Sequence, residues 1–285
     1  MRATKRANLL VAAQADGLKT TSIGRWALDK YRLVSLYSRL FSTGMKNKWL
    51  NRVYIDLCAG SGLSQIEGTG QLYYGSPLLA LSVPDPFNRY IFCERDKDSL
   101  HALRKRVQRL FAATDVRFVP GHYDDRINEV AKEIPRADSV LTFCFIDPFD
   151  LSIKFSTIQR LSSRRVDFLL VLMLNMDANR NVKHYANVTN RKIDEFLGLP
   201  GWRKEWQEEE KKGTSFPEFL AETFSKQMES LGYLHVPFHR MKLIRSDANL
   251  PLYHLALFSK HERAYKYWDE VLTYSTNQTS FQFNS

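Results

Sequence analysis

The chain has 285 residues, of which 44% are apolar, and it is long enough to bury the core of one sizeable α/β domain. No apolar run reaches the ~18 residues that a membrane span needs, so we expect no membrane partner. The formal net charge of +10 favours a polyanionic partner, and nucleic acid is the partner that we expect.

In the first half of the chain, predicted helices alternate with predicted strands. Apolar side chains recur at helical spacing from Trp26 to Phe41, which predicts an amphipathic helix that ends near Gly44. A first strand over residues 53–57 opens onto a glycine-rich turn, and Ser76-Pro77 marks the start of a further helix. The strands that follow are expected at 89–93, 116–119, 140–146 and, just beyond the midpoint of the chain, 166–174. The helices between them are expected at 97–111, 124–133 and 154–162.

The second half of the chain has a different character. Helices are expected near 188–197 and 217–231, with a charged, tryptophan-bearing segment over 201–213 between them. Strands over 233–244 and 252–258 predict an antiparallel hairpin at one sheet edge, followed by a last helix over 261–274. Seven strands with a final antiparallel pair resemble the methyltransferase form of the Rossmann-like, doubly wound α/β sheet, which is mostly parallel with helices on both faces.

We expect a single domain over residues 1–285. Within it, we expect an N-terminal helical segment at about 20–45 and a helical insertion at about 180–231.

The glycine-rich turn after the first strand is the first candidate binding element. The apolar run ends in Asp56, and Ala59, Gly60 and Gly62 follow within the next six positions. Glycines allow close ligand approach at the point where open α/β sheets place their ligands. The third glycine of the dinucleotide fingerprint is missing. The turn resembles instead the first motif of methyltransferases that bind S-adenosylmethionine, and these four residues are the expected contacts of that cofactor.

Two further acids follow strands and are candidate cofactor contacts. Glu94 closes the second strand, where Rossmann-like folds place an acid that accepts hydrogen bonds from ribose hydroxyls. The alternative is a solvated acid or a partner of Arg95. Asp124 follows the third strand, where methyltransferase-like sites bring an acid near the adenine; Asp125 competes for that role, and a helix cap is the other interpretation of Asp124.

The sequence Asp147-Pro148-Phe149 directly follows the fourth strand. It resembles the Asp-Pro-Pro-aromatic motif of amino-group methyltransferases. That chemistry needs acceptors for the hydrogens of an exocyclic amine and an aromatic face on which a base can stack. Asp147 and the Pro148 carbonyl are candidates for the first task, and Phe149 for the second. The alternative is a turn that ends the strand, with Phe149 in the core.

Polar and aromatic residues beyond the fifth strand could line a substrate cleft. They are Asn175, Asp177, Asn179 and Arg180. Ordinary loop and helix-cap positions are the other interpretation. Trp202 and Trp206 could stack on a nucleic acid, although tryptophans four residues apart on a helix are also typical of packing.

The three cysteines, Cys58, Cys93 and Cys144, have no paired spacing, which argues against disulfides and fits a reducing, cytoplasmic compartment. Each falls in or at the end of an expected strand, and these strands would be neighbours in a methyltransferase-like sheet. The C-x-x-C spacing of common metal sites is absent. We therefore expect no metal and interpret the cysteines as small buried hydrophobic residues.

Taken in order, the motifs of the chain are similar to those of the three-Cys-motif partner (TcmP) family, bacterial proteins that look like methyltransferases. The matching segments are Tyr54-Ile55-Asp56-Leu57-Cys58-Ala59-Gly60-Ser61-Gly62, Gly75-Ser76-Pro77-Leu78, Glu94, Phe145-Ile146-Asp147-Pro148-Phe149 and Pro251-Leu252-Tyr253-His254-Leu255. The family is named for a cysteine motif in its partner protein, so the resemblance implies such a partner. Cys58, Ser61 and Asp150 stand where the family pattern has Phe, Pro and Gly.

Two classes of function follow. The first is an S-adenosylmethionine-dependent methyltransferase that acts on an amino group of a nucleic acid. The second is a non-catalytic, methyltransferase-like subunit that binds nucleic acid or a partner protein, because a fold does not by itself define an activity.

Overall fold

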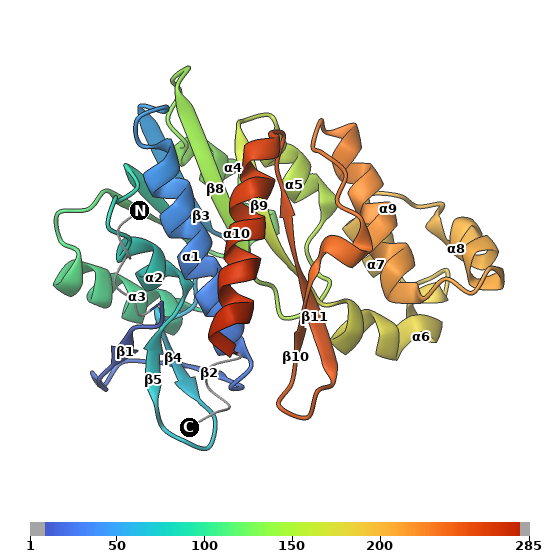
Figure 1. The fold of residues 1–285 in the computed structure, drawn as a ribbon, viewed down its shortest axis with the longest axis horizontal. Helices are drawn as coiled ribbons and strands as arrows, with labels where there is room; N and C mark the ends of the chain where they lie inside the picture. Colours follow the sequence, from blue (N-terminus) through green and yellow to red (C-terminus); the bar gives the residue numbers. More distant parts are fainter. Residues whose placement is uncertain (1–8, 280–285) are drawn as a thin grey trace.

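The structure, a computed structural model, describes residues 9–279 and is built around a seven-stranded sheet (Figure 1). The strand order is β10-β11-β9-β8-β3-β6-β7. The bounds are β3 (Asn51–Asp56), β6 (Arg89–Glu94), β7 (Val116–Pro120), β8 (Val140–Ile146), β9 (Val166–Leu172), β10 (Lys242–Arg245) and β11 (Pro251–Phe258). Only β11 runs antiparallel to its neighbours, β9 and β10. The predicted fold class is confirmed.

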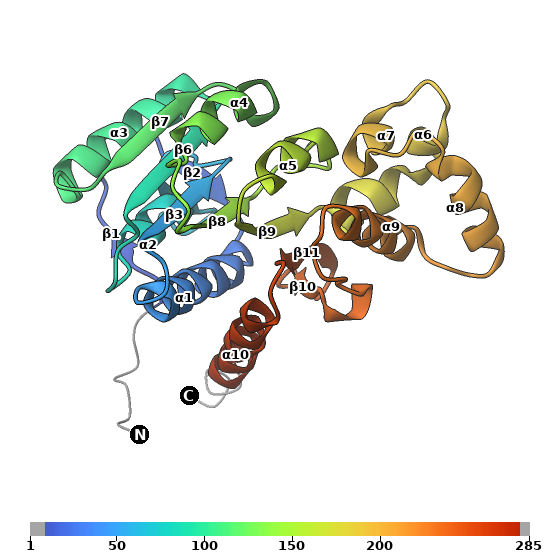
Figure 2. The same cartoon turned by 90° about the horizontal axis from the view of Figure 1, so that it is seen from above.

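Helices cover both faces of this sheet (Figure 2). The α-helices of the described chain are α1 (Ala27–Met45), α2 (Ser76–Leu81), α3 (Lys97–Leu110), α4 (Tyr123–Glu133), α5 (Phe155–Ser162), α6 (Val182–Ala186), α7 (Lys192–Leu197), α8 (Trp202–Lys211), α9 (Phe216–Ser230) and α10 (Glu262–Thr279), of which α6, α7 and α8 lie to one side of the sheet. Helices α1 and α10 lie side by side on one face, and α4 and α5 lie on the other. No helix among residues 9–279 is both long and apolar enough to cross a membrane.

A second, four-stranded sheet was not expected. It has the order β1-β5-β4-β2 and consists of β1 (Ala12–Ala13), β2 (Thr21–Ile23), β4 (Leu63–Ile66) and β5 (Leu72–Tyr74). Strands of two to four residues are too short to leave a periodic pattern in the sequence. The sheet matters for function because β2 pairs with β4, which places the N-terminal segment beside the glycine turn.

The core includes nearly all of β8 and the whole of β9. Every residue of β9 is buried, as expected for a strand that has neighbours on both sides and helices on both faces. The three strands that carry or precede the cysteines, β8, β3 and β6, are adjacent as predicted, and all three thiols are free. No group of three or more metal-ligating side chains occurs within the described part of the chain.

Some element bounds were wrong. The strand expected over 233–244 is reduced to Lys242–Arg245, with a 3-10 turn over Phe238–Arg240 before it. Pro237 has no N–H to donate to a ladder, and the amides of Val236 and Phe238 donate to side chains of α9 instead of a strand. The helix expected from residue 188 begins only at Lys192, whose amide donates to Asn190 Oδ1.

Candidate functional site

The glycine turn follows β3 and is hydrogen-bonded to the end of β6. Gly60 and Gly62 have φ angles of +61° and +85°, which side chains with a Cβ rarely adopt. A Cβ on Gly62 would lie 2.8 Å from a Leu103 methyl carbon. The Gly60 amide donates a 2.8 Å hydrogen bond to Glu94 Oε2. The structure therefore brings Glu94 directly to the turn, and its second oxygen accepts from the Asp96 amide.

Asp56 and Ala59 lie beneath the turn. Asp56 is fully buried and accepts a 3.2 Å hydrogen bond from the Cys58 amide. Burial raises the pKa of Asp56 to about 7, against the opposing effect of a hydrogen bond from Ser76. Ala59 is also buried, and its amide donates to the Cys93 carbonyl. Both residues shape the turn.

Asp124 makes hydrogen bonds that the sequence did not suggest. The N-cap of α4 is His122, whose side chain accepts from the Asp124 amide, so the helix-cap interpretation of Asp124 was wrong. The Asp124 carboxylate accepts from the Lys154 amide and the Thr157 hydroxyl, at the start of α5. It thus ties α4 to α5, and a contact with the cofactor stays a prediction.

Asp147 forms an ion pair with Lys30 of α1, a residue that the sequence analysis missed. The two side chains are only 16% and 9% exposed. Burial lowers the pKa of Lys30, but the charge and hydrogen bond of Asp147, together with Tyr253 and Tyr31, raise it above the ordinary value. The ammonium also lies 5.3 Å and 5.7 Å from the ring centres of Tyr31 and Tyr253. Lys30 therefore stays a cation and is paired with Asp147.

Phe149 projects into solvent with 88% of its surface exposed. The alternative that placed Phe149 in the core is wrong, whereas the preceding Pro148 is buried. The loop that follows is fixed by Lys192 of α7, whose ammonium lies 2.8 Å from Asp150 and 2.9 Å from Asp177. Asp150 is thereby paired with a cation, and it does not place an uncompensated charge beside Asp147.

Among the polar residues that follow β9, Asp177 holds the loop after Asp147 in place. It accepts hydrogen bonds from the Leu151 amide and the Tyr185 hydroxyl in addition to its ion pair with Lys192. The two tryptophans of α8 are buried against Phe216 and Phe219. Stacking of Trp202 and Trp206 on a nucleic acid was therefore the wrong interpretation, and packing is their role.

An unexpected clamp covers the glycine turn. Arg106 of α3 is fully buried, donates two hydrogen bonds to Asp16 and one of 2.6 Å to the Ser61 carbonyl. Arg106 belongs to the basic run Arg104-Lys105-Arg106, but its burial removes it from the charged surface. Helical spacing could have indicated the buried position, because Arg106 follows Leu103 and Ala102 on the apolar face of α3.

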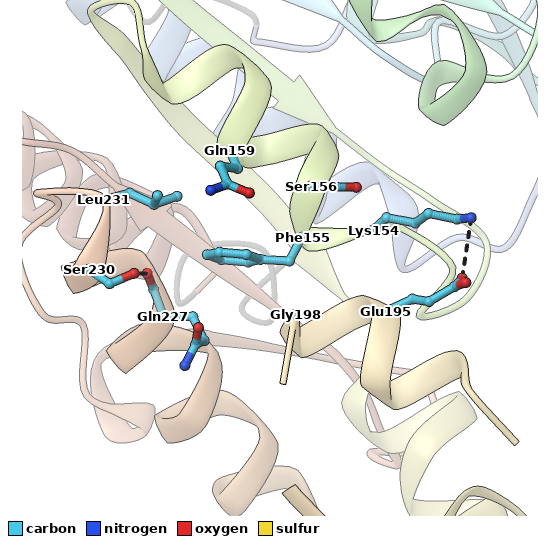
Figure 3. A pocket seen from close by; sticks show the side chains of 9 residues that line it. All are labelled: Lys154, Phe155, Ser156, Gln159, Glu195, Gly198, Gln227, Ser230 and Leu231. Carbon is cyan, nitrogen blue, oxygen red and sulfur yellow. Dashed lines mark hydrogen bonds and ion pairs between the residues drawn. The ribbon is translucent and has the colours of Figure 1, made fainter. Parts of the chain in front are cut away.

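A groove of about 400 Å³ lies between α5, α7 and α9 (Figure 3). Phe155 projects into it, and the ion pair of Lys154 with Glu195 closes one end at 3.4 Å. None of the residues predicted to bind cofactor or substrate lines the groove.

The strand order, the antiparallel edge hairpin and the glycine turn define a Rossmann-like α/β fold of the methyltransferase type. No protein-family model matches the sequence, and no curated protein matches it. Among solved structures, a Legionella pneumophila protein is 13% identical over 59% of this chain and 73% of its own, with a TM-score of 0.41.

Two further solved structures are similarly distant. A Staphylococcus aureus protein assigned as a caffeoyl-CoA O-methyltransferase is 12% identical over 79% of this chain and 83% of its own, with a TM-score of 0.40. Trm1 from Pyrococcus horikoshii, solved with S-adenosyl-L-methionine, is 10% identical over 84% of this chain and 57% of its own, with a TM-score of 0.39.

Proposed function

We propose that the protein is an S-adenosylmethionine-dependent methyltransferase that acts on an amino group of a nucleic acid. The observation that carries the proposal is the exposed Phe149 beside Asp147, at the sheet edge that also holds the glycine turn and Glu94. Parallel strands end at this edge, where open α/β sheets bind their ligands.

The residues around the turn fit the cofactor. Gly60 and Gly62 keep the backbone free of side chains, and Glu94 offers carboxylate oxygens suited to ribose hydroxyls. Asp56 and Ala59 would support the turn from below, and Asp124 would contribute from the start of α4. The cofactor, when bound, supplies an electrophilic methyl group.

The Asp147 segment would orient the acceptor. Its carboxylate and the Pro148 carbonyl can accept the hydrogens of an exocyclic amine, and Phe149 presents a ring on which the base can stack. The Asp147 carboxylate already forms an ion pair with the Lys30 ammonium. The amine must therefore displace that ammonium or share the carboxylate with it. The catalytic contribution of the protein would be mainly positioning.

A basic surface would contribute the affinity for phosphates. The chain has ten more positive than negative charges, and Arg160, Arg164 and Arg165 form one of its clusters. A second cluster comprises Arg240, Lys242 and Arg245. Arg240 forms an ion pair with Asp269. Arg106 is buried and therefore does not contribute to this basic surface. Affinity for nucleic acid should fall steeply with salt if such residues contact phosphates.

We also propose membership of the three-Cys-motif partner family, because the matching motifs occur in order over nearly the whole chain. That family would supply a protein partner. The ion pair of Lys30 with Asp147 favours the second candidate function, a methyltransferase-like subunit without catalysis, because the carboxylate that would receive the acceptor is already satisfied.

The test is transfer of a radiolabelled methyl group from S-adenosylmethionine into RNA or DNA. We expect transfer by the natural protein and its loss in Asp147→Ala, in protein that still binds the cofactor. Asp150→Ala is the matched control, because it removes a carboxylate of the same loop that pairs with Lys192 instead. No transfer by the natural protein, despite cofactor binding, would favour the binding-subunit function. Unchanged transfer by Asp147→Ala would remove Asp147 from the mechanism.

A further inference from the structure

A second cavity, of about 300 Å³, lies at the opposite edge of the large sheet. It is enclosed by α1, α10 and the first residues of β8 and β9. Its lining comprises Tyr37, Phe41, Met45, Lys48, Trp49, Leu141, Asp167, Ser259, His261, Arg263, Ala264 and Tyr267. None of these residues was assigned to the candidate cofactor or acceptor site.

The inner end of the cavity is polar although it is buried. Asp167 is only 8% exposed, and within residues 9–279 its carboxylate accepts a single hydrogen bond, at 2.6 Å from the Ser259 hydroxyl. Burial raises the pKa of Asp167 to about 7, with the Ser259 hydrogen bond opposing that shift. Nearby, the fully buried Tyr37 hydroxyl has no hydrogen-bond partner in the described part of the chain. Buried polar atoms of this kind are costly unless something satisfies them.

The walls and the rim have different chemistry. Aromatic rings of Tyr37, Phe41, Trp49 and Tyr267 line the walls. The rim carries three basic side chains, Lys48, His261 and Arg263, all exposed. Within residues 9–279, neither Lys48 nor Arg263 forms an ion pair with a carboxylate. A ligand would therefore meet a hydrogen-bond acceptor at depth, aromatic surfaces in the middle and positive charge at the mouth.

This cavity is remote from Asp147. Leu141 is the second residue of β8 and Asp147 follows its last residue, so the two lie about 20 Å apart at ~3.3 Å per strand residue. Helix α1 nevertheless reaches both places, because Lys30 pairs with Asp147 while Tyr37 and Phe41 line the cavity.

We propose that this cavity binds a small aromatic molecule with a hydrogen-bond donor at its inner end and an anionic group at its outer end. The donor satisfies Asp167, the ring packs between Trp49 and Tyr267, and the anion meets Lys48 and Arg263. A purely apolar ligand would leave Asp167 and Tyr37 unsatisfied. An aromatic cation would suit the aromatic walls but would be repelled at the rim.

Indole-3-acetate is a probe of this class, because its ring N–H and its carboxylate lie at opposite ends. Calorimetry and thermal unfolding of the full chain would be measured with indole-3-acetate, with 1-methylindole-3-acetate, which lacks the donor, and with indole, which lacks the anion. We expect indole-3-acetate to bind and raise the melting temperature, and each analogue to bind at least about tenfold more weakly.

Two variants locate the binding. Ala264→Phe fills the cavity and should abolish binding; Arg263→Glu changes only an exposed side chain and should weaken it by at least about tenfold. Lys204→Glu, exposed on α8, is the matched charge control and should bind as the natural protein does. No heat of binding and no rise in melting temperature with millimolar indole-3-acetate would overturn the proposal. So would unchanged binding by Arg263→Glu, or binding of the methylated analogue as tight as that of the parent.

Discussion

Lys30 is the residue that most changes the view of the candidate site. It lies on the core-facing side of α1, between the buried residues Ala27 and Val34. A lysine at such a position is the signal that the sequence analysis overlooked, because buried ammonium groups need a partner. Its partner, Asp147, comes from a segment 117 residues away, which no local pattern could reveal.

Removing either member of this pair should be destabilising. Lys30→Met leaves Asp147 as an unpaired, largely buried carboxylate, and we expect the free energy of unfolding to fall by about 3 kcal/mol. The double variant Lys30→Met/Asp147→Asn should recover most of that loss. Urea unfolding measures both, with Lys46→Met as the control because its ion pair with Asp85 is exposed to solvent and is expected to contribute little to stability. Simple additivity of the single losses would contradict a coupled pair.

Phe149 should matter for binding and not for stability. Because 88% of its surface is exposed, Phe149→Ala should change the free energy of unfolding by less than about 0.5 kcal/mol. If the ring stacks on a base, affinity for single-stranded nucleic acid should weaken by about 1–3 kcal/mol. Fluorescence anisotropy with Leu250→Ala as the control tests this, since Leu250 is an exposed apolar residue on the β10–β11 turn. Equal affinities of the two variants would argue against stacking.

At the scale of elements, the long periodic segments were predictable and the short ones were not. The bounds of β8 agree at both ends with the prediction, because a continuous apolar run bounded by polar residues is distinctive. The small sheet was missed because its strands have two to four residues and gain their stability from pairing with one another. The shortened β10 shows how a proline and side-chain acceptors end a strand that propensity alone would extend.

The N-terminal segment before β2 should depend on Arg106. Arg106→Met would leave the buried Asp16 carboxylate without its main partner. We expect the free energy of unfolding to fall by about 3 kcal/mol. Arg109→Met is the matched control, because Arg109 also contacts Asp16 but is 57% exposed. We expect this substitution to lower the free energy of unfolding by less than about 1 kcal/mol. Equal effects of the two substitutions in thermal or urea unfolding would contradict the assignment of Arg106 as the main partner of Asp16.

The same pair predicts a pH dependence. The Arg106 hydrogen bond lowers the pKa of Asp16 to about 2, from a usual value near 3.8. An acid with a lowered pKa in the folded state stabilises the protein above its unfolded-state pKa, and that contribution is lost as the pH falls. We therefore expect part of the stability of the natural protein to disappear between about pH 4 and pH 2. Stability curves of Arg106→Met should lack that part; identical curves would count against the assignment.

At the scale of the whole molecule, the sequence was sufficient for the sheet and for the edge at which ligands would bind. It located the glycine turn, Glu94 and the Asp147 segment at that edge because parallel strands end together. It could not reveal which charges are already paired, since Lys30, Arg106 and Lys192 meet their partners only through tertiary packing. Whether the edge still serves catalysis depends on those pairings.

The most direct test of the central claim is calorimetric titration of the natural protein with S-adenosylmethionine and its demethylated product. We predict binding of both, a higher melting temperature with either ligand, and an affinity at least about tenfold lower in Glu94→Ala. Glu129→Ala, which removes an exposed acid of α4, should bind as the natural protein does. No heat and no thermal shift at saturating ligand would contradict the assignment of the glycine turn as a cofactor site.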